Sequence, residues 1–462
     1  MRLFRFFSII LQTEIDKFKY GQMKKRIIGC LLTGLLTLSS SAQISKTLSP
    51  YSQFGLGVIA EQSTGFNRGM SGLGIGIRDG KIANVINPAS YSAVDSLTMI
   101  IDMGVSGQIT NHKEGNKKVN SKTADFDYAV TAFRILPKFG ASIGVIPYSN
   151  IGYSYYDAEW VGEPETFSYA KITDNYYNNT YTGSGGFSQA FLGLGWEFAK
   201  GFSIGANMSY FWGKYTKTIA AVFNDSYANM LTKTYSTNVN SWKLDLGAQW
   251  TGKINENDRL TVGAIAGIGH KLGAEASLSI VNTNTQTSVT TTSTDSVPNG
   301  LSIPFTFGAG VSLVHKNSLT LGVDYVMQRW GALDYPMVNE TTKRYQATSG
   351  VLKDRHKVTI GADWIPDANP LSRGFFKHIH YRLGASYATP YYNIGAVEGP
   401  KELAVSAGLA IPIVNTWNNR TTLNVSAQWV NTSAKNLVTE NSFRITIGLT
   451  FNERWFAKWK VD

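Results

Sequence analysis

Residues 443–451, near the end of the chain, read Phe-Arg-Ile-Thr-Ile-Gly-Leu-Thr-Phe. Five large apolar residues, Phe443, Ile445, Ile447, Leu449 and Phe451, alternate with smaller or polar ones. Successive side chains of a β-strand point to opposite faces, so the pattern predicts a strand with one apolar and one polar face. About ten such residues are enough for a tilted strand to cross a lipid bilayer.

The same two-residue rhythm recurs from Ser96 to Phe451. We count roughly fourteen segments separated by alternately short and long gaps, as in barrels of the outer-membrane type. Clear examples are 242–250, Trp-Lys-Leu-Asp-Leu-Gly-Ala-Gln-Trp, and 423–429, Leu-Asn-Val-Ser-Ala-Gln-Trp. The pattern predicts an all-β fold, a membrane-spanning antiparallel β-barrel of about 14 strands.

Charged residues within these segments set the expected register. A Lys or Arg on the lipid face of a barrel costs about 2–4 kcal/mol at the bilayer midplane. We therefore expect eight charged side chains to face the lumen: Asp102, Asp245, Asp324, Asp363, Lys243, Lys357, Arg382 and Arg444. Tryptophans near segment ends are typical of interfacial aromatic girdles, although each one taken alone is as readily an ordinary packed tryptophan. They are Trp212, Trp250, Trp330, Trp364, Trp429 and Trp455.

The connections between segments favour the same topology. Tight turns are expected at 136–138, 199–201 and 314–317, and long extracellular loops at 152–185, 213–237, 270–299 and 328–353. The stretch 282–297 is nearly all Thr, Ser and Asn, which predicts a solvated loop. The alternative is a large soluble β-sandwich or propeller, but soluble strands are shorter, about 5–6 residues.

Composition agrees with a barrel and excludes several classes of protein. Of 462 residues, 43% are hydrophobic and 16% are charged. The net charge of +11 falls to about +6 without residues 1–42, which carry seven Lys/Arg and two Asp/Glu. No basic cluster with interleaved aromatics is present, so no nucleic-acid partner is expected. The one cysteine, Cys30, lies in the N-terminal apolar stretch, so we expect no disulfide or thiol site.

The expected domain organisation has four parts. Residues 1–42 are predicted to be a signal peptide, with a basic start at 23–26, an apolar run at 27–38 and cleavage before Gln43. Residues 1–22 are then an overextended gene start, and a short N-terminal membrane anchor is the alternative. Residues 43–95, rich in Gly, Ser and Asn, are predicted to form a plug, 96–451 the barrel and 452–462 a periplasmic tail.

The predicted plug contains the most specific local motif. Residues 67–76 read Asn-Arg-Gly-Met-Ser-Gly-Leu-Gly-Ile-Gly, and Asn87-Pro88-Ala89-Ser90 follows. This region resembles the plug of the FadL/TodX-like (OMPP1) family of outer-membrane transporters for hydrophobic compounds, which has an Arg-x-x-Met-Gly-Gly-like stretch and then Asn-Pro-Ala. Ser71 and Ser90 depart from the glycines of that family. The resemblance implies that Asn87, Pro88 and Ala89 belong to the plug or gate, as a static seal or a moving part.

Pro147 lies within the third predicted strand. Proline cannot donate to a strand ladder, so it predicts a bulge or kink, unless the strand ends there. The resemblance implies that Pro147 and Tyr148 flank a lateral opening in the barrel wall, facing the Asn87-Pro88-Ala89 segment.

The sequence contains no catalytic signature. Gly-x-Ser-x-Gly, P-loop and HExxH motifs are missing, and His378 and His380 share a strand face without an evident third ligand. We therefore expect no enzyme activity, no catalytic residues, no cofactor and no metal site.

The expected function is passive uptake of hydrophobic small molecules or fatty acids through the outer membrane of a Gram-negative cell. The alternative is a FadL-like, non-transporting scaffold subunit of an outer-membrane secretion or assembly complex, because the tyrosine-rich loop at 152–185 and the basic tail also suit protein contacts. Expected partners are outer-membrane lipid, a hydrophobic ligand and, under the alternative, other outer-membrane proteins.

Overall fold

A computed structural model describes residues 49–96, 98–158, 177–223, 228–339, 342–369, 374–414 and 420–454. The predicted signal peptide, the centre of the loop after β4 and most of the predicted tail lie outside the described residues. Within the described chain, no helix is long and apolar enough to span a membrane.

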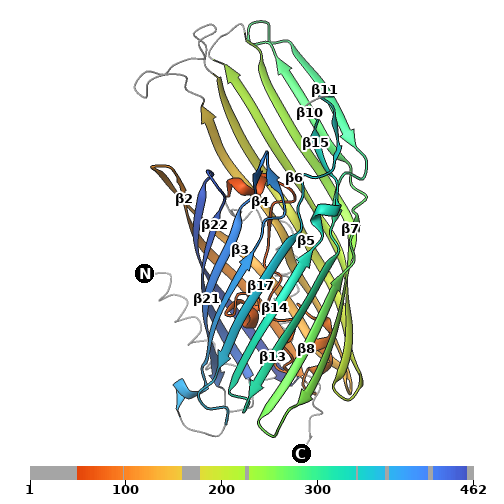
Figure 1. Cartoon of the computed structure of the whole chain (residues 1–462), viewed down its shortest axis with the longest axis vertical. Helices are drawn as coiled ribbons and strands as arrows, with labels where there is room; N and C mark the ends of the chain where they lie inside the picture. The colour runs from red at the N-terminus through yellow and green to blue at the C-terminus, as the bar shows by residue number, and fades with distance from the viewer. Residues whose placement is uncertain are drawn as a thin grey trace, which may run out of the picture. The chain divides into compact units, whose positions relative to one another are not determined.

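Fourteen strands form a closed antiparallel barrel, which confirms the predicted fold class (Figure 1). The barrel closes by pairing of its first and last strands over Thr98–Lys113 and Thr439–Arg454. The strands, in order around the wall, are β2 (Thr98–Glu114), β3 (Lys117–Leu136), β4 (Phe139–Ala158), β5 (Tyr177–Ala199), β6 (Phe202–Phe223), β7 (Met230–Lys253), β8 (Asp258–Gly267), β13 (Thr306–His315), β14 (Leu319–Gln328), β17 (Arg355–Trp364), β18 (His380–Ala388), β21 (Lys401–Val414), β22 (Arg420–Ser433) and β23 (Thr439–Arg454).

The remaining elements are short. Within the described residues, four precede the barrel: η1 (Pro50–Gln53), β1 (Val58–Ile59), α3 (Gly65–Arg68) and η2 (Pro88–Ala93). The others lie in connections between barrel strands: β9 (His270–Lys271), β10 (Ala276–Thr283), β11 (Thr290–Val297), β12 (Ser302–Ile303), η3 (Trp330–Ala332), β15 (Tyr335–Val338), β16 (Tyr345–Thr348), η4 (Phe375–His378), β19 (Asn393–Ile394) and β20 (Val397–Glu398).

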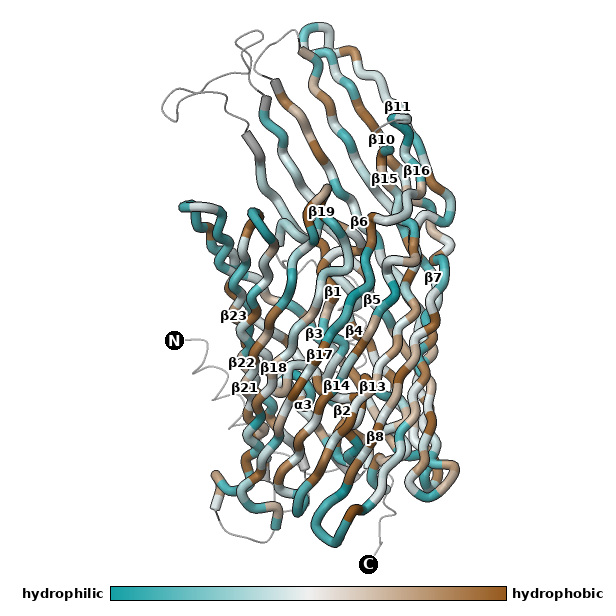
Figure 2. The backbone as a smooth tube through the Cα atoms, viewed as in Figure 1, coloured by the Kyte–Doolittle hydropathy of each residue, from teal (hydrophilic) through white to brown (hydrophobic). Residues whose placement is uncertain are grey.

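The predicted alternation is confirmed along the barrel strands (Figure 2). The paired residues Val311, Val323 and Ile360 point outward and are 44%, 52% and 51% exposed. Large apolar residues are exposed in this way on most barrel strands. The eight charged residues expected in the lumen face inward: Asp102, Asp324, Asp363 and Arg382 are buried, and Lys243, Asp245, Lys357 and Arg444 line an internal cavity.

Two of the four predicted long loops are largely strand. β6 and β7 continue through most of 213–237, and β10 and β11 form a hairpin that pairs with β7. The stretch 282–297 is therefore strand and not loop for most of its length, although residues 285–295 are exposed as expected. These segments carry Thr, Ser and Tyr on both faces, so the apolar alternation that marks the other strands is missing. Thr and Tyr nevertheless favour strands. Figure 1 shows these strands extending past the ends of β2 and β3.

The closure of the barrel predicts a specific crosslink. Val105 and Ile447 are cross-strand partners on the outer face, and antiparallel partners have the Cα separation that a disulfide needs. The double variant Val105→Cys, Ile447→Cys, made without Cys30, is expected to form an intramolecular disulfide that shifts its gel migration. Val105→Cys with Ile360→Cys on β17 is the control, and equal crosslinking of both would contradict the register.

Candidate functional site

The chain before the barrel, residues 49–96, packs against inward-facing side chains of the wall; we call it the lumen segment. The Asp324 carboxylate on β14 accepts hydrogen bonds from the backbone N–H groups of Gly74 at 2.7 Å and Ile75 at 2.8 Å. The Gln249 side-chain amide on β7 donates to the carbonyl oxygens of Ile75 and Ile77. The lumen segment is therefore held by the buried polar groups that the barrel points inward.

Asn87, Pro88 and Ala89 lie at the start of η2. Asn87 caps this turn by accepting a hydrogen bond from the Ala89 N–H, and Pro88 occupies the first helical position, where its missing N–H costs nothing. The Asn87 side-chain amide also donates to the carbonyl oxygens of Ile75 at 2.9 Å and Ala248 at 3.1 Å, joining the turn to β7. A moving gate at these three residues stays a prediction.

A belt of glycines surrounds the lumen segment. Ten consecutive strands, from β4 around to β21, each present an inward glycine where a Cβ atom would lie 2.0–2.8 Å from an atom of the lumen segment. At six of these glycines the nearest atom of the lumen segment belongs to its backbone, and at the other four it belongs to a side chain. The missing Cβ atom of glycine leaves room for this close approach. The belt residues are Gly140, Gly195, Gly205, Gly247, Gly263, Gly310, Gly322, Gly361, Gly384 and Gly408.

The wall pairing is interrupted between β3 and β4. The two strands pair only from Leu136–Phe139 to Ala129–Val145, after which β3 pairs with β2 alone. On the freed edge of β4, Val58 and Ile59 of β1 pair instead with Asn150 and Ser149. We call this interruption the seam.

Pro147 and Tyr148 lie at the seam, well inside β4 and not at its end. The register with β5 shifts between Pro147 and Ser149, which gives the bulge that the proline predicts. Pro147 is half-buried, and the buried Tyr148 ring packs edge-on against Phe211 at 5.0 Å between ring centroids. Passage of a ligand between these residues and β3 stays a prediction.

The lumen segment contacts the two sides of the seam differently. On the β4 side the contacts involve the backbone: Ala60 N–H donates to the Tyr148 carbonyl at 2.9 Å, and the Gln62 amide donates to the Pro147 carbonyl at 2.6 Å. On the β3 side, a buried ion pair joins Arg68 Nη1 to Asp127 Oδ1 at 3.1 Å.

A cavity of about 340 Å³ adjoins the seam. Next to the seam its lining includes the apolar and aromatic residues Phe126, Ile146, Pro147, Tyr148 and Phe191, together with the carboxylates of Asp125 and Asp127 on β3. Away from the seam the lining is charged and polar, with Arg355 and Lys357 on β17 and Arg444 on β23. The cavity is therefore amphipathic.

Glu61 of the lumen segment faces the same cavity. Burial acts to raise the pKa of its carboxyl group, but Arg68, Lys357, the Ser63 hydroxyl and Arg444 together lower that pKa below its ordinary value. Glu61 is therefore a carboxylate at neutral pH and offsets part of the positive charge of the cavity.

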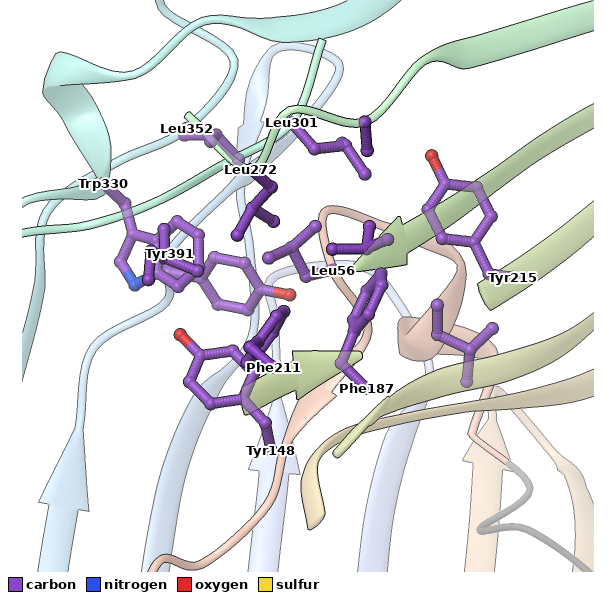
Figure 3. Packing of buried hydrophobic residues seen from close by; sticks show 14 of the residues in the cluster. Leu56, Tyr148, Phe187, Phe211, Tyr215, Leu272, Leu301, Trp330, Leu352 and Tyr391 are labelled. Carbon is purple, nitrogen blue, oxygen red and sulfur yellow. The ribbon is translucent and has the colours of Figure 1, made fainter. Parts of the chain in front are cut away.

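At the end of the barrel opposite the tight turns, an apolar cluster packs around the start of the lumen segment (Figure 3). Leu56 of the lumen segment packs there among aromatic residues from several strands and connections, including Phe187, Phe211 and Tyr391. Trp330 is fully buried in this cluster, so its expected place in an exposed girdle is wrong. Of the others, Trp250, Trp364 and Trp429 are 39–49% exposed on the barrel.

Sequence reasoning missed several residues of this site. Lys217 donates to the carbonyl oxygens of Gln53 at 2.8 Å and Gly55 at 2.9 Å, and nothing in the local sequence of β6 indicates that contact. The alternation of inward and outward residues does not indicate the inward position of Asp127, because a bulge in the β2–β3 pairing shifts that alternation at this point of β3. The expectation that His378 and His380 share a strand face is wrong, because His378 ends η4 and only His380 lies on β18. The Nδ1 atom of His380 lies 2.8 Å from the Asp363 carboxylate, a neighbour that the local sequence does not indicate.

Among described residues, no group of three His, Cys, Asp or Glu side chains is placed to hold a metal ion.

The fold of the chain resembles solved structures of the FadL type. The structure of a Pseudomonas aeruginosa FadL homologue aligns over 86% of this chain and 99% of its own, with a TM-score of 0.58 and 10% identity. The Pseudomonas putida toluene transporter TodX aligns over 87% and 99%, with a TM-score of 0.55 and 11% identity. The Ralstonia pickettii toluene transporter TbuX aligns over 87% and 99%, with a TM-score of 0.54 and 12% identity. The fold class is therefore a FadL-like β-barrel.

The sequence family is narrower than this fold. The family model BamG matches residues 23–462, nearly the whole chain, and the chain belongs to the BamG family. The resemblance to FadL/TodX thus identified the fold correctly, but not the family. No curated protein matches the sequence.

The glycine belt predicts the effect of adding one methyl group. A Cβ at Gly205 would lie 2.4 Å from the Pro88 carbonyl carbon and 2.6 Å from the Ala89 nitrogen. Because both contacts are with backbone, Gly205→Ala is expected to lower the free energy of unfolding by about 1–3 kcal/mol. The control is Gly107→Ala, whose new Cβ would meet only Thr123 O at 4.0 Å. Thermal unfolding in detergent compares the two, and equal stability would contradict tight seating of η2.

Proposed function

We propose that this protein is a passive channel of the Gram-negative outer membrane for hydrophobic or amphipathic small molecules. The ligand binds in the cavity beside the lumen segment and leaves sideways into the bilayer through the seam between β3 and β4. The observation that carries the proposal is the loss of wall pairing where the apolar side of the cavity reaches β3 and β4.

The outer surface supports a membrane location. Exposed Val, Leu, Ile, Phe and Trp side chains recur on the outward positions of nearly all barrel strands. Soluble monomers rarely expose contiguous apolar patches above a few hundred Å². In a bilayer this surface faces hydrocarbon, and the closed ladder leaves few backbone groups unpaired.

The amphipathic cavity supports a route through the seam. A ligand with an apolar body is stabilised against Phe126, Ile146 and Phe191, which lie next to the seam. The lumen segment obstructs a direct path along the barrel axis, because its backbone or side-chain atoms contact inward glycines on ten strands of the wall. A sideways exit into hydrocarbon also avoids transferring the apolar body back into water.

A non-transporting scaffold is the second candidate function. The observation that favours it is the tight seating of the lumen segment, which suits a permanently closed barrel. The extended sheet of β6, β7, β10 and β11 then offers a surface for other outer-membrane proteins.

The lateral route predicts that a charge at the seam slows uptake. Phe126 is the cross-strand partner of the outward Val105 and lines the cavity. Phe126→Lys places a cation in the path of an apolar ligand, where desolvation is costly. In cells lacking the native gene and complemented with each variant, Phe126→Lys is expected to lower the initial uptake rate of N-phenyl-1-naphthylamine several-fold relative to wild type.

Phe307→Lys on β13 is the matched control, because Phe307 is also an outward phenylalanine, 48% exposed, but does not line the cavity. Its uptake should match wild type once folded barrel is quantified by heat-dependent gel migration. Equal uptake by cells with and without the gene, together with stoichiometric partners in mild-detergent purification, would favour the scaffold.

The membrane location predicts a cost for charge on the outer face. Val323→Arg on β14 is expected to destabilise the protein in lipid vesicles by about 2–4 kcal/mol. Val289→Arg, in the connection between β10 and β11 where the side chain is 60% exposed, should have an effect within about 0.5 kcal/mol. Urea titration of folding into vesicles measures both, and similar values would contradict the proposed membrane band.

A further inference from the structure

We infer that the lumen segment has a fixed part and a movable part, and that the movable part, residues 57–63, gates the seam through an ion-pair latch between Arg68 and Asp127. We call residues 57–63 the gate strand and residues 69–91 the seated part. The inference deepens the proposed function and rests on it, because it assigns the regulation of the same seam.

The seated part is fixed by contacts on all sides. Its closest approaches to the wall involve Gly69, Met70, Leu73, Ile75 and residues 87–91 against the glycine belt. Buried hydrogen bonds that Asp324 accepts and that Gln249 and Asn87 donate add to these approaches. Displacing this part breaks many buried polar contacts at once, each worth about 1–3 kcal/mol when left unsatisfied.

The gate strand is held more loosely. Residues 58–62 are half-buried, whereas most residues from 63 to 77 are buried. Its ladder with β4 covers two residue pairs, Val58–Asn150 and Ile59–Ser149. Single hydrogen bonds add to this ladder: Ala60 and Gln62 donate to β4, and Gly57 and Gln62 accept from Tyr391 and Gln189. Segments with few buried contacts open at lower free energy than a packed core.

Arg68 links the gate strand to β3. Its Nε donates to the Ser63 carbonyl at 3.2 Å and its Nη2 to the Glu61 carbonyl at 3.3 Å, while Nη1 pairs with Asp127. The guanidinium also lies over the Tyr128 ring, 5.5 Å from the centroid. Asp127 is buried, and Ser106 donates to the same carboxylate oxygen that Arg68 binds. One cation thus fastens two carbonyls of the gate strand to the free edge of β3.

This arrangement sets the direction of opening. The backbone ladder keeps the gate strand on β4, whereas the contact through Arg68 with β3 depends on side chains alone. Breaking the ion pair frees the β3 side and leaves the β4 ladder and the seated part in place. The gate strand therefore moves away from β3 while remaining paired with β4.

The test measures access from the bilayer to a thiol on the gate strand. The reporter is Ala60→Cys in protein lacking Cys30, reconstituted in phosphatidylcholine vesicles and labelled with N-(1-pyrenyl)maleimide, which partitions into the bilayer. Adding Asp127→Asn, which keeps the shape but removes the charge, is expected to raise the labelling rate about tenfold. Asp127→Glu, which keeps the carboxylate, should remain near the reporter alone.

A disulfide tests whether the seated part stays still. The hydroxyl oxygens of Ser71 and Ser406 lie 2.8 Å apart, so Ser71→Cys with Ser406→Cys should crosslink the seated part to β21 on oxidation. The oxidised crosslink should leave the labelling rate of the Asp127→Asn reporter unchanged, and its formation also shows that the variant is folded. A crosslink that suppresses labelling would overturn the division into fixed and movable parts.

The outcomes separate the latch from the route. Rapid labelling that Asp127→Asn does not change would overturn the latch while leaving the seam as a route. No labelling in any variant, with normal labelling after denaturation, would overturn the route itself and with it the proposed function.

Discussion

Backbone hydrogen bonding between β3 and β4 stops at Ala129 and Val145, and the way in which the freed strand edges are satisfied shapes the rest of the structure. Within a bilayer, an unpaired backbone N–H or C=O costs several kcal/mol, so a broken wall needs a substitute partner. The lumen segment provides one on the β4 side through Val58 and Ile59. The same segment must also be anchored, and the glycine belt allows this by bringing two backbones into direct contact.

Anchoring and opening impose different demands on one short segment. Residues 69–91 meet the first demand, because the wall presents a glycine without a side chain at each strand that this part of the segment passes closely. Residues 57–63 suit the second, because they are held to β4 by a two-pair ladder with a few single hydrogen bonds, and to β3 through one arginine. Charges inside the barrel contribute to both: Asp324 holds the backbone at Gly74 and Ile75, whereas Asp127 holds Arg68. The inward charges of the wall thus also position the lumen segment.

Much of the barrel could be predicted from sequence because lipid-facing strands need strict alternation, as residues 443–451 and 242–250 show. The lumen-facing positions of Asp324 and Arg382 followed from the same rule. The strand extensions could not be predicted this way, because β10 and β11 carry polar residues on both faces and lose the alternation. The roles of Asp127 and Lys217 depend on a bulge and on contacts with residues 53–68, far away in sequence, which no local pattern encodes. Pro147 did indicate a bulge, because a missing N–H is a local property.

The lumen segment thus combines a rigid anchor with a labile strand at the interrupted wall. Hydrogen–deuterium exchange of the protein in lipid nanodiscs can distinguish the two parts, because amide exchange reports local opening. We expect backbone amides of residues 57–63 to exchange at least about a hundredfold faster than those of residues 70–77, a difference of about 2.7 kcal/mol in opening free energy. Equal protection of the two stretches, or faster exchange in residues 70–77, would contradict this division into two parts.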